Sequence, residues 1–278
     1  MALLNLNFES QYLQNNTEVS IILPERPRDV DSKIFYGSEE KYKVLWLLHG
    51  TYGDHSDWLR KTSVELYAVE SNLIVVSPSA LNSDYMNWNG FGAGFRMWDF
   101  ITEELMPIVY NWFPASDRRE DNFIAGLSMG AFGATALGVA HPDKFAALAA
   151  LSGAPFNYEK IRDGAEIGIA GLGERMKNQV ANAGGWDAYL ASPSNTWKTI
   201  TENHKGGKLP CMYFAMGTKD FLWDSYLDFK NHAAENDIGA TFEEFVGFEH
   251  EWRFWDLTIQ RALDFFGITD PSKHGNAF

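Results

Sequence analysis

The chain has 278 residues, of which 45% are hydrophobic and 22% are charged, so it can bury a sizeable core without disulfides or a structural metal. Its formal net charge of −14 argues against nucleic acids and anionic membranes as partners, because binding to either depends on basic patches. The single cysteine, Cys211, excludes an intramolecular disulfide and is expected to be buried in a strand. The N-terminus shows no signal peptide and no transmembrane segment, so we expect a cytoplasmic protein.

The first half of the chain alternates strand patterns with helical patterns. Residues 3–24 alternate apolar and polar side chains, which predicts two antiparallel strands at one edge of a sheet. The polar residues 26–41 predict a connecting loop. Continuous apolar runs at 43–49 and 73–77 predict strands that are covered on both faces. The helices expected in this half are 56–70 and 97–112.

The second half repeats this rhythm, which implies an α/β fold with a mostly parallel central sheet and helices on both faces. Residues 153–207 break the rhythm, because they are rich in Gly and Asn and show weak helical periodicity. We interpret them as an insertion over the functional edge of a single domain that spans residues 1–278. Strands are predicted at 122–125, 145–151, 211–216 and 241–246, and helices at 129–140, 224–236 and 251–265.

The most informative motif is G-L-S-M-G at residues 126–130, which follows an apolar run and precedes a helical pattern. This is the G-x-S-x-G order of a nucleophile elbow, in which a sharp strand-to-helix turn lifts the serine hydroxyl clear of the sheet. Gly126 and Gly130 leave room for the turn and for the packing of helix on strand. Ser128 is therefore the candidate nucleophile, and the alternative is an ordinary serine in a glycine-rich turn.

A serine nucleophile needs a base to accept its proton. His250 is the candidate, because it lies between the last predicted strand and the last predicted helix, where a loop can carry an imidazole over Ser128. The segment does not match a zinc-binding H-E-x-x-H pattern, since Phe occupies position 254. The other histidines either precede the serine or stand in segments predicted as caps, helix surface, loop or tail, namely His49, His55, His141, His204, His232 and His274.

The base in turn needs an acid that orients it. Asp220 is the candidate acid, because it follows the predicted strand 211–216 and so lies at the same edge of the sheet as Ser128. Asp224 is the second candidate, although its place at the start of a predicted helix suits a cap. The chain order of serine, acid and histidine is the order that accompanies a nucleophile elbow.

Acyl transfer also needs two backbone N–H groups that stabilise the negatively charged oxygen of the tetrahedral intermediate. Met129 directly follows the nucleophile and is expected to supply one of them. The second is expected from Thr51, in the glycine-containing loop that follows the strand 43–49. The alternative for this loop is an ordinary turn between a strand and a helix.

Four segments together resemble the esterase D family of α/β-hydrolases, which includes tributyrin esterases, feruloyl and acetyl-xylan esterases, S-formylglutathione hydrolases and mycolyltransferases. They are residues 49–59, 126–130, 217–222 and 250–252, and the resemblance extends from about residue 18 to 267. It implies an α/β-hydrolase fold without a metal or an organic cofactor. It also implies a catalytic triad and an oxyanion hole made by Ser128, Asp220, His250, Thr51 and Met129.

Aromatic residues suggest how a small-molecule ester is bound. Trp88, Phe91, Phe95 and, from the insertion, Trp186 are expected to line a cleft or to stack on a sugar or phenolic ring. The alternative is that they only pack the loops in which they occur.

The expected function is that of a serine carboxylesterase that hydrolyses short-chain acyl, acetyl or feruloyl esters, including sugar esters, through an acyl-enzyme. Within the same fold, the alternatives are a thioesterase of the S-formylglutathione hydrolase type and an acyltransferase. An alternative of another class is a non-catalytic binding protein that keeps the hydrolase fold. A homo-oligomer is kept open, because such assemblies are common.

Overall fold

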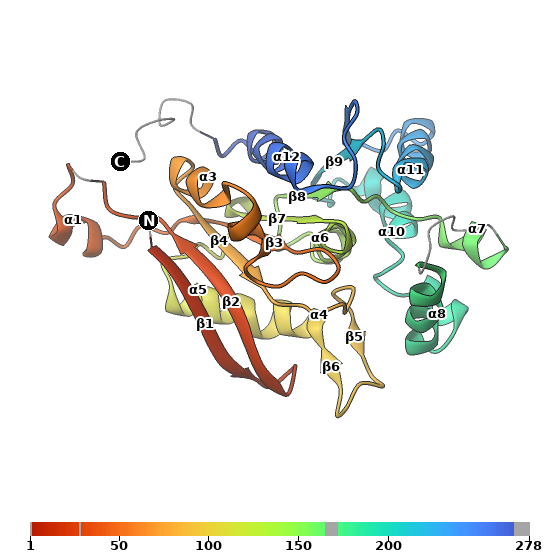
Figure 1. Ribbon diagram of the computed structural model, residues 1–278, viewed down its shortest axis with the longest axis horizontal. Helices are drawn as coiled ribbons and strands as arrows, with labels where there is room; N and C mark the ends of the chain where they lie inside the picture. The colour runs from red at the N-terminus through yellow and green to blue at the C-terminus, as the bar shows by residue number, and fades with distance from the viewer. Residues whose placement is uncertain (1, 28, 165–171, 270–278) are drawn as a thin grey trace.

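The computed structural model describes residues 2–27, 29–164 and 172–269. Among these residues, eight strands form one sheet in the order β1-β2-β4-β3-β7-β8-β9-β10, with helices on both sides (Figure 1). All neighbours from β4 to β10 run parallel, so the predicted α/β architecture is confirmed. The strands are β1 (Ala2–Ser10), β2 (Asn15–Leu23), β3 (Lys43–Leu48), β4 (Leu73–Pro78), β7 (Asn122–Leu127), β8 (Ala147–Leu151), β9 (Cys211–Gly217) and β10 (Thr241–Phe245).

The sheet separates two apolar cores, as the alternation along β3 shows. Trp46 and Leu47 are both fully buried, but they belong to the clusters on opposite faces. Successive side chains of a strand point to opposite faces, so a continuous apolar run needs cover on both sides. Helix α6 (Met129–Ala140) provides that cover on one face, and α12 (Trp252–Phe265) provides it on the other.

The N-terminal strands β1 and β2 form the predicted antiparallel hairpin, and β2 joins the parallel strands through β4. The predicted loop 26–41 contains one short helix, α1 (Ser32–Tyr36), whose first turn is capped by the side chain of Asp31. The expected burial of Cys211 is wrong. This residue is exposed, because it is the first residue of β9 and stands at the rim of the sheet.

The two helices expected in the first half are less regular than predicted. Residues 56–70 form two helices, because Thr62 is extended and the Ser63 N–H donates to the carboxylate of Asp256 at 2.9 Å rather than to a helical carbonyl. Residues 97–112 form one run with a π-helical turn in its middle. These elements are α2 (Asp57–Lys61), α3 (Val64–Glu70), α4 (Met97–Asp99), the π-helical η1 (Phe100–Leu105) and α5 (Met106–Trp112).

The segment that follows β8 is mostly helical in its described part. Figure 1 shows its helices gathered at the end of the molecule opposite α1. They are α7 (Tyr158–Arg162), α8 (Leu172–Ala183), α9 (Trp186–Leu190), α10 (Thr196–Asn203) and the 3₁₀ turn η3 (His204–Gly206). The remaining elements are a small hairpin of β5 (Asn87–Trp88) and β6 (Phe95–Arg96), the 3₁₀ turn η2 (Arg119–Asp121) and helix α11 (Trp223–Glu235).

Asn122 anchors the start of β7, the strand that leads to Ser128. Its side chain is fully buried, and its Oδ1 accepts hydrogen bonds from Trp46 Nε1 at 3.0 Å and from Tyr110 Oη at 2.8 Å. Its Nδ2 donates to the carbonyls of Ser116 and Arg118. One amide therefore satisfies four polar groups, and its bonds to Trp46 and Ser116 are buried.

We predict that Asn122→Leu lowers the free energy of unfolding by at least about 3 kcal/mol, because several buried polar groups lose their partners together and each costs about 1–3 kcal/mol. Urea denaturation measures this change. The matched control is Asn203→Leu at the exposed end of α10, which should stay within about 0.5 kcal/mol of the wild type. Equal stability of the two variants would contradict the role of Asn122.

Candidate active site

Ser128 stands at a strained turn between β7 and α6. Its backbone has φ 52° and ψ −117°, a conformation that L residues rarely adopt, and its N–H donates to the carbonyl of Leu151 at 2.9 Å. A Cβ at position 126 would lie 2.3 Å from the carbonyl oxygen of Gly130, and one at position 130 would lie 2.4 Å from that of Leu48. Both glycines are therefore required for β7, α6 and β3 to meet this closely.

The structure brings the three candidate triad residues together. His250, in the loop between β10 and α12, has Nε2 at 2.9 Å from Ser128 Oγ. Its Nδ1 lies 2.9 Å from Oδ2 of Asp220, which follows the end of β9. Because a carboxylate only accepts, Nδ1 carries the proton of the neutral ring, and Nε2 is then free to accept from the serine hydroxyl.

The imidazole of His250 is also held by its aromatic neighbours. The ring of Phe221 lies 4.4 Å from it, centroid to centroid, and the ring of Trp255 meets it edge-on at 5.0 Å. The indole of Trp255 is fixed in turn, because its Nε1 donates to Oγ of the buried Ser152 at 2.9 Å. The ring therefore has little freedom to leave the plane in which both of its nitrogens are bonded.

Asp220 is only 3% exposed, and its charge is compensated locally. Burial raises the pKa of this carboxyl, but the hydrogen bond and electrostatic attraction of His250, with help from the Leu222 N–H and the Ser152 hydroxyl, outweigh burial and hold the pKa below its usual 3.8. The Leu222 N–H donates to Oδ1 at 2.9 Å. The carboxylate is thus ionised at neutral pH and oriented through both oxygens.

The loop after β3 is held in place by the segment that follows β4. The hydroxyl of Tyr85 donates to the carbonyl of His49 at 2.9 Å, and Asn82 Oδ1 accepts from the N–H of Tyr52 at 2.8 Å. Thr51 lies between His49 and Tyr52, the two anchored residues of the loop. It borders the same cavity as Ser128 and Met129. The structure thus brings both candidate oxyanion residues to the nucleophile.

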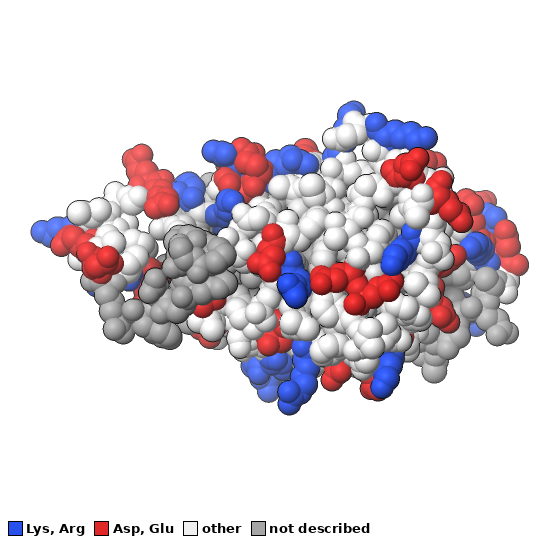
Figure 2. Space-filling view, turned by 90° about the horizontal axis from the view of Figure 1, so that it is seen from above, with Lys and Arg blue, Asp and Glu red and all other residues white. Residues whose placement is uncertain are grey.

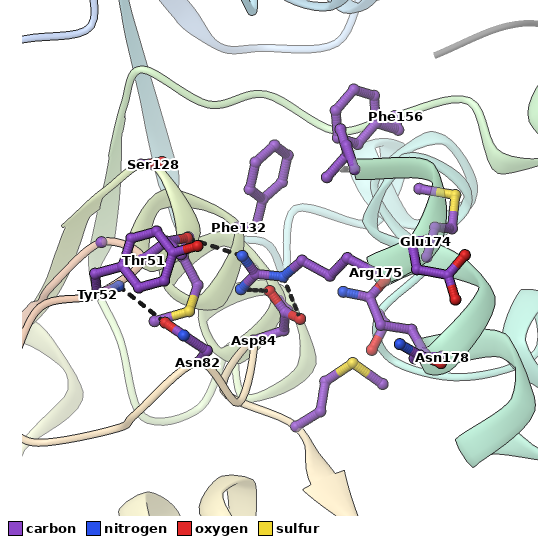
Figure 3. A pocket seen from close by; sticks show the side chains of 18 of the residues that line it. Thr51, Tyr52, Asn82, Asp84, Ser128, Phe132, Phe156, Glu174, Arg175 and Asn178 are labelled. Atoms are coloured by element: carbon purple, nitrogen blue, oxygen red, sulfur yellow. Dashed lines mark hydrogen bonds and ion pairs between the residues drawn. The ribbon is translucent and has the colours of Figure 1, made fainter. Parts of the chain in front are cut away.

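A cavity of about 1510 Å³ opens beside Ser128. Figure 3 shows Arg175 in its middle, with Phe132 and Phe156 on one side and Asn82 and Asn178 on the other. Two kinds of side chain dominate the wall. Aromatic ones include four from α6 and from the segment after β8, and amides come from α8 and from the loops around β5. These are Phe132, Phe156, Tyr158 and Tyr189, and Asn82, Asn89, Asn178, Gln179 and Asn182.

Two of the four aromatic residues expected at the substrate site border this cavity. They are Trp88 and Phe91, and the Phe91 side chain is 61% exposed. Phe95 and Trp186 do not border it. Phe95 is buried in β6 against the ring of Phe91, and Trp186 packs on Tyr189 behind the wall. The aromatic content of the sequence did not reveal which rings would pack inward.

The other histidines that the structure describes contact residues other than Ser128 and Asp220. His49 is buried beneath the loop after β3. Burial lowers the pKa of His49, and its ring is neutral, with Nδ1 donating to the carbonyl of Gly50 and Nε2 accepting from the Ala80 N–H. His141 ends α6 as predicted, and His232 bonds to the hydroxyl of Thr201. The site of His274 lies outside the described residues.

Within residues 2–27, 29–164 and 172–269, no three His, Cys, Asp or Glu side chains are grouped in a way that could bind a metal ion. The described helices include none with both the length and the hydropathy needed to cross a bilayer.

Sequence reasoning missed Arg175 and Asp84, which form a partly buried ion pair inside the cavity. A signal for α8 was present, because Arg175, Asn178, Gln179 and Asn182 follow helical i, i+3, i+4, i+7 spacing and therefore share one face. All four border the cavity. No comparable signal pointed to Asp84, which lies in an irregular loop.

We predict that Asp220→Asn removes a pH-dependent part of the stability. The lowered pKa of Asp220 means that its contribution is complete above about pH 5 and is lost as the pH falls through the folded-state pKa. The wild type should therefore exceed the variant by a constant free energy of unfolding above about pH 5 and by a shrinking one down to about pH 3.

Urea denaturation across this pH range checks the prediction. The matched control is Glu235→Gln on the exposed surface of α11, which should follow the wild type throughout. A difference for Asp220→Asn that stays constant down to pH 3 would contradict the lowered pKa.

A family model and a curated relative match nearly the whole chain. The family model described as "Putative esterase" matches residues 10–266. An acetyl esterase from Caldicellulosiruptor saccharolyticus is 30% identical over 278 residues, covering 95% of this chain and 97% of that protein.

Two solved structures from Staphylococcus aureus have the same fold over nearly their whole length. The fluorophosphonate-binding serine hydrolase FphF, with substrate bound, is 28% identical with a TM-score of 0.79, covering 97% of this chain and 99% of that chain. The S-formylglutathione hydrolase FrmB, as apoenzyme, is 27% identical with a TM-score of 0.76, covering 95% of this chain and 98% of that chain. The chain therefore belongs to this esterase family, in its esterase D-like group, and is a serine carboxylesterase with the α/β-hydrolase fold.

Proposed function

We propose that the chain hydrolyses esters through an acyl-enzyme formed on Ser128. His250 Nε2 accepts the hydroxyl proton as Oγ attacks the ester carbonyl, and it then returns the proton to the departing alcohol. Asp220 holds the tautomer and stabilises the imidazolium. Water attacks the acyl-enzyme with the same base and releases the acid. The observation that carries this proposal is the pair of 2.9 Å contacts that His250 makes with Ser128 and Asp220.

In this proposal the N–H groups of Thr51 and Met129 stabilise the oxyanion. Met129 is the first residue of α6, so its N–H belongs to the end of a helix whose dipole favours negative charge. Thr51 lies in the loop that Tyr85 and Asn82 hold in place. We further propose that residues 153–207 form an insertion within a single catalytic domain, because Arg175 and other residues of α8 border the cavity.

The cavity supports small neutral esters with a short or aromatic acyl group and a polyhydroxylated alcohol group, such as a sugar. Its volume of about 1510 Å³ exceeds the range of about 300–1,000 Å³ that holds most small ligands, so an acetyl group alone leaves it largely unfilled. Aromatic walls suit acyl chains and ring stacking, and the amides can exchange hydrogen bonds with hydroxyl groups. The acetyl esterase relative supports acetyl esters among these substrates.

The second candidate is a thioesterase of the S-formylglutathione hydrolase type, which the likeness to FrmB supports. The charges in the cavity favour neutral oxyesters instead. Among its described lining residues, both basic side chains are paired, Lys61 with Asp57 at 2.9 Å and Arg175 with Asp84. On the face drawn in Figure 2, both acidic and basic side chains are scattered over the surface. An anionic thiol carrier therefore finds no unpaired Lys or Arg in the described lining of the cavity.

We predict that the wild type cleaves acetyl, butyryl and feruloyl sugar esters faster than S-formylglutathione, and that Ser128→Ala lowers kcat by about 10⁶-fold on every ester that is cleaved. Product release, followed by pH-stat and chromatography, measures these rates. A fluorophosphonate probe should label the wild type and leave Ser128→Ala unlabelled. Faster turnover of S-formylglutathione than of any oxyester would favour the thioesterase instead.

We also predict that Phe91→Ala raises KM for feruloyl or acetyl sugar esters by about 2- to 10-fold, because an aromatic contact contributes about 0.5–1.5 kcal/mol. KM for p-nitrophenyl acetate should stay unchanged, since that ester is too small to span the cavity. The control is Trp112→Ala, another exposed aromatic, which does not border the cavity. Equal effects of Phe91→Ala on both ester classes would exclude a sugar contact at this residue.

A further inference from the structure

Arg175 crosses the cavity from α8 to the loop after β3 that holds Thr51, which is the oxyanion loop of the proposed mechanism. Its Nη1 donates to Thr51 Oγ1 at 2.8 Å, and its Nε donates to Asp84 Oδ2 at 2.8 Å, while Nη2 pairs with Asp84 Oδ1. Figure 3 shows the guanidinium lying between Thr51 and Asp84. The two side chains of the ion pair are only 23% and 12% exposed, so water competes weakly with these bonds.

Asp84 is a rigid anchor for this guanidinium. Asp84 and Tyr85 both have positive φ, at 54° and 57°, and so does Leu81, at 51°. Such strain persists only where the surroundings hold the backbone. Here they do, because Tyr85 is 1% exposed and its hydroxyl donates to the carbonyl of His49. The Nε hydrogen bond and the Nη2 ion pair to the same carboxylate hold the guanidinium at Asp84.

Fixing the side chain of Thr51 also restrains its backbone. Threonine is branched at Cβ, so its χ1 has few allowed values and those depend on φ and ψ. The hydrogen bond from Arg175 selects one of them. An oxyanion donor acts through preorganisation, and a displacement of about 1 Å can cost about 10²-fold in rate. The orientation of the Thr51 N–H therefore matters directly to the chemistry.

We propose that Arg175 is a positioning residue that aligns the N–H of Thr51 for the oxyanion by holding the threonine side chain against Asp84. This inference rests on the proposed function, in which Thr51 is an oxyanion donor. It links the segment after β8 to the chemistry at Ser128, because a residue of α8 then sets the geometry of the loop after β3.

Direct binding of a substrate carboxylate by Arg175 is the competing role. It fits the contacts less well, because Asp84 already occupies the Nε–Nη2 edge of the guanidinium, which is an edge that an incoming carboxylate would use. The two roles differ in what they change. Positioning alters kcat for neutral and anionic esters alike, whereas substrate binding alters KM for anionic esters.

The test compares Arg175→Met, Thr51→Val and the double variant. Thr51→Val keeps the shape, the backbone N–H and the ion pair, so it isolates the hydroxyl contact. Each single variant should lower kcat for a neutral acetyl ester by about 10- to 100-fold with less than about a threefold change in KM. The rate of labelling by a neutral fluorophosphonate should fall by the same factor. The double variant should be no slower than the slower single variant, because both changes remove the same contact, the hydrogen bond between Arg175 and Thr51.

The matched control is Lys177→Met, which removes a cation from the exposed side of α8 and should keep wild-type kinetics. A Thr51→Val variant with the kcat of the wild type would overturn the proposal. A double variant whose loss in kcat equals the product of the two single losses would overturn it as well. A rise in KM confined to anionic esters in Arg175→Met would also overturn it. If Arg175→Met does not fold, Thr51→Val and Arg175→Lys decide, and the lysine variant should retain part of the activity. Failure of this inference leaves wild-type hydrolysis intact, whereas a wild type that cleaves no ester would end both proposals.

Discussion

The strained backbone of Ser128 is the constraint on which the rest of the site depends. A residue in such a conformation costs about 1–3 kcal/mol, and it persists because its surroundings allow no alternative. The contact of Gly126 with Gly130 fixes α6 against β7, and the bond to the Leu151 carbonyl fixes the turn against β8. The hydroxyl is thereby lifted to a point that the imidazole of His250 can reach from a separate loop.

Convergence of distant residues follows from the parallel sheet. The loops that hold Thr51, Ser128, Asp220 and His250 each leave the carboxyl end of a strand, and in parallel strands those ends lie at one edge. This is why the sequence could place all four residues together, since β3, β7 and β9 read as apolar runs that end in polar or glycine-containing loops. The motif order then selected one histidine and favoured one acid among several.

Other features were beyond the reach of the sequence, because they depend on how irregular segments pack. Arg175 and Asp84 are 91 positions apart, and their pairing requires both α8 and the strained loop after β4 in their final places. Whether an aromatic side chain faces a cavity is also a tertiary property, as the burial of Phe95 and the exposure of Phe91 show within one hairpin. The exposure of Cys211 depends on its place at the rim of the sheet rather than on the apolar run around it.

The wall of the cavity is built from parts that the sheet does not supply. Asn182 of α8 accepts from the N–H of Asn89 and donates to the carbonyl of Asn87, so it joins α8 to the loop around β5. Arg175, two helical turns earlier, joins the same face of α8 to the oxyanion loop. These cross-links are polar, and the apolar packing of α8 comes from other residues, among them Met176 and Val180, which are buried. A change in α8 can therefore reshape the wall of the cavity while the sheet keeps Ser128, His250 and Asp220 in place.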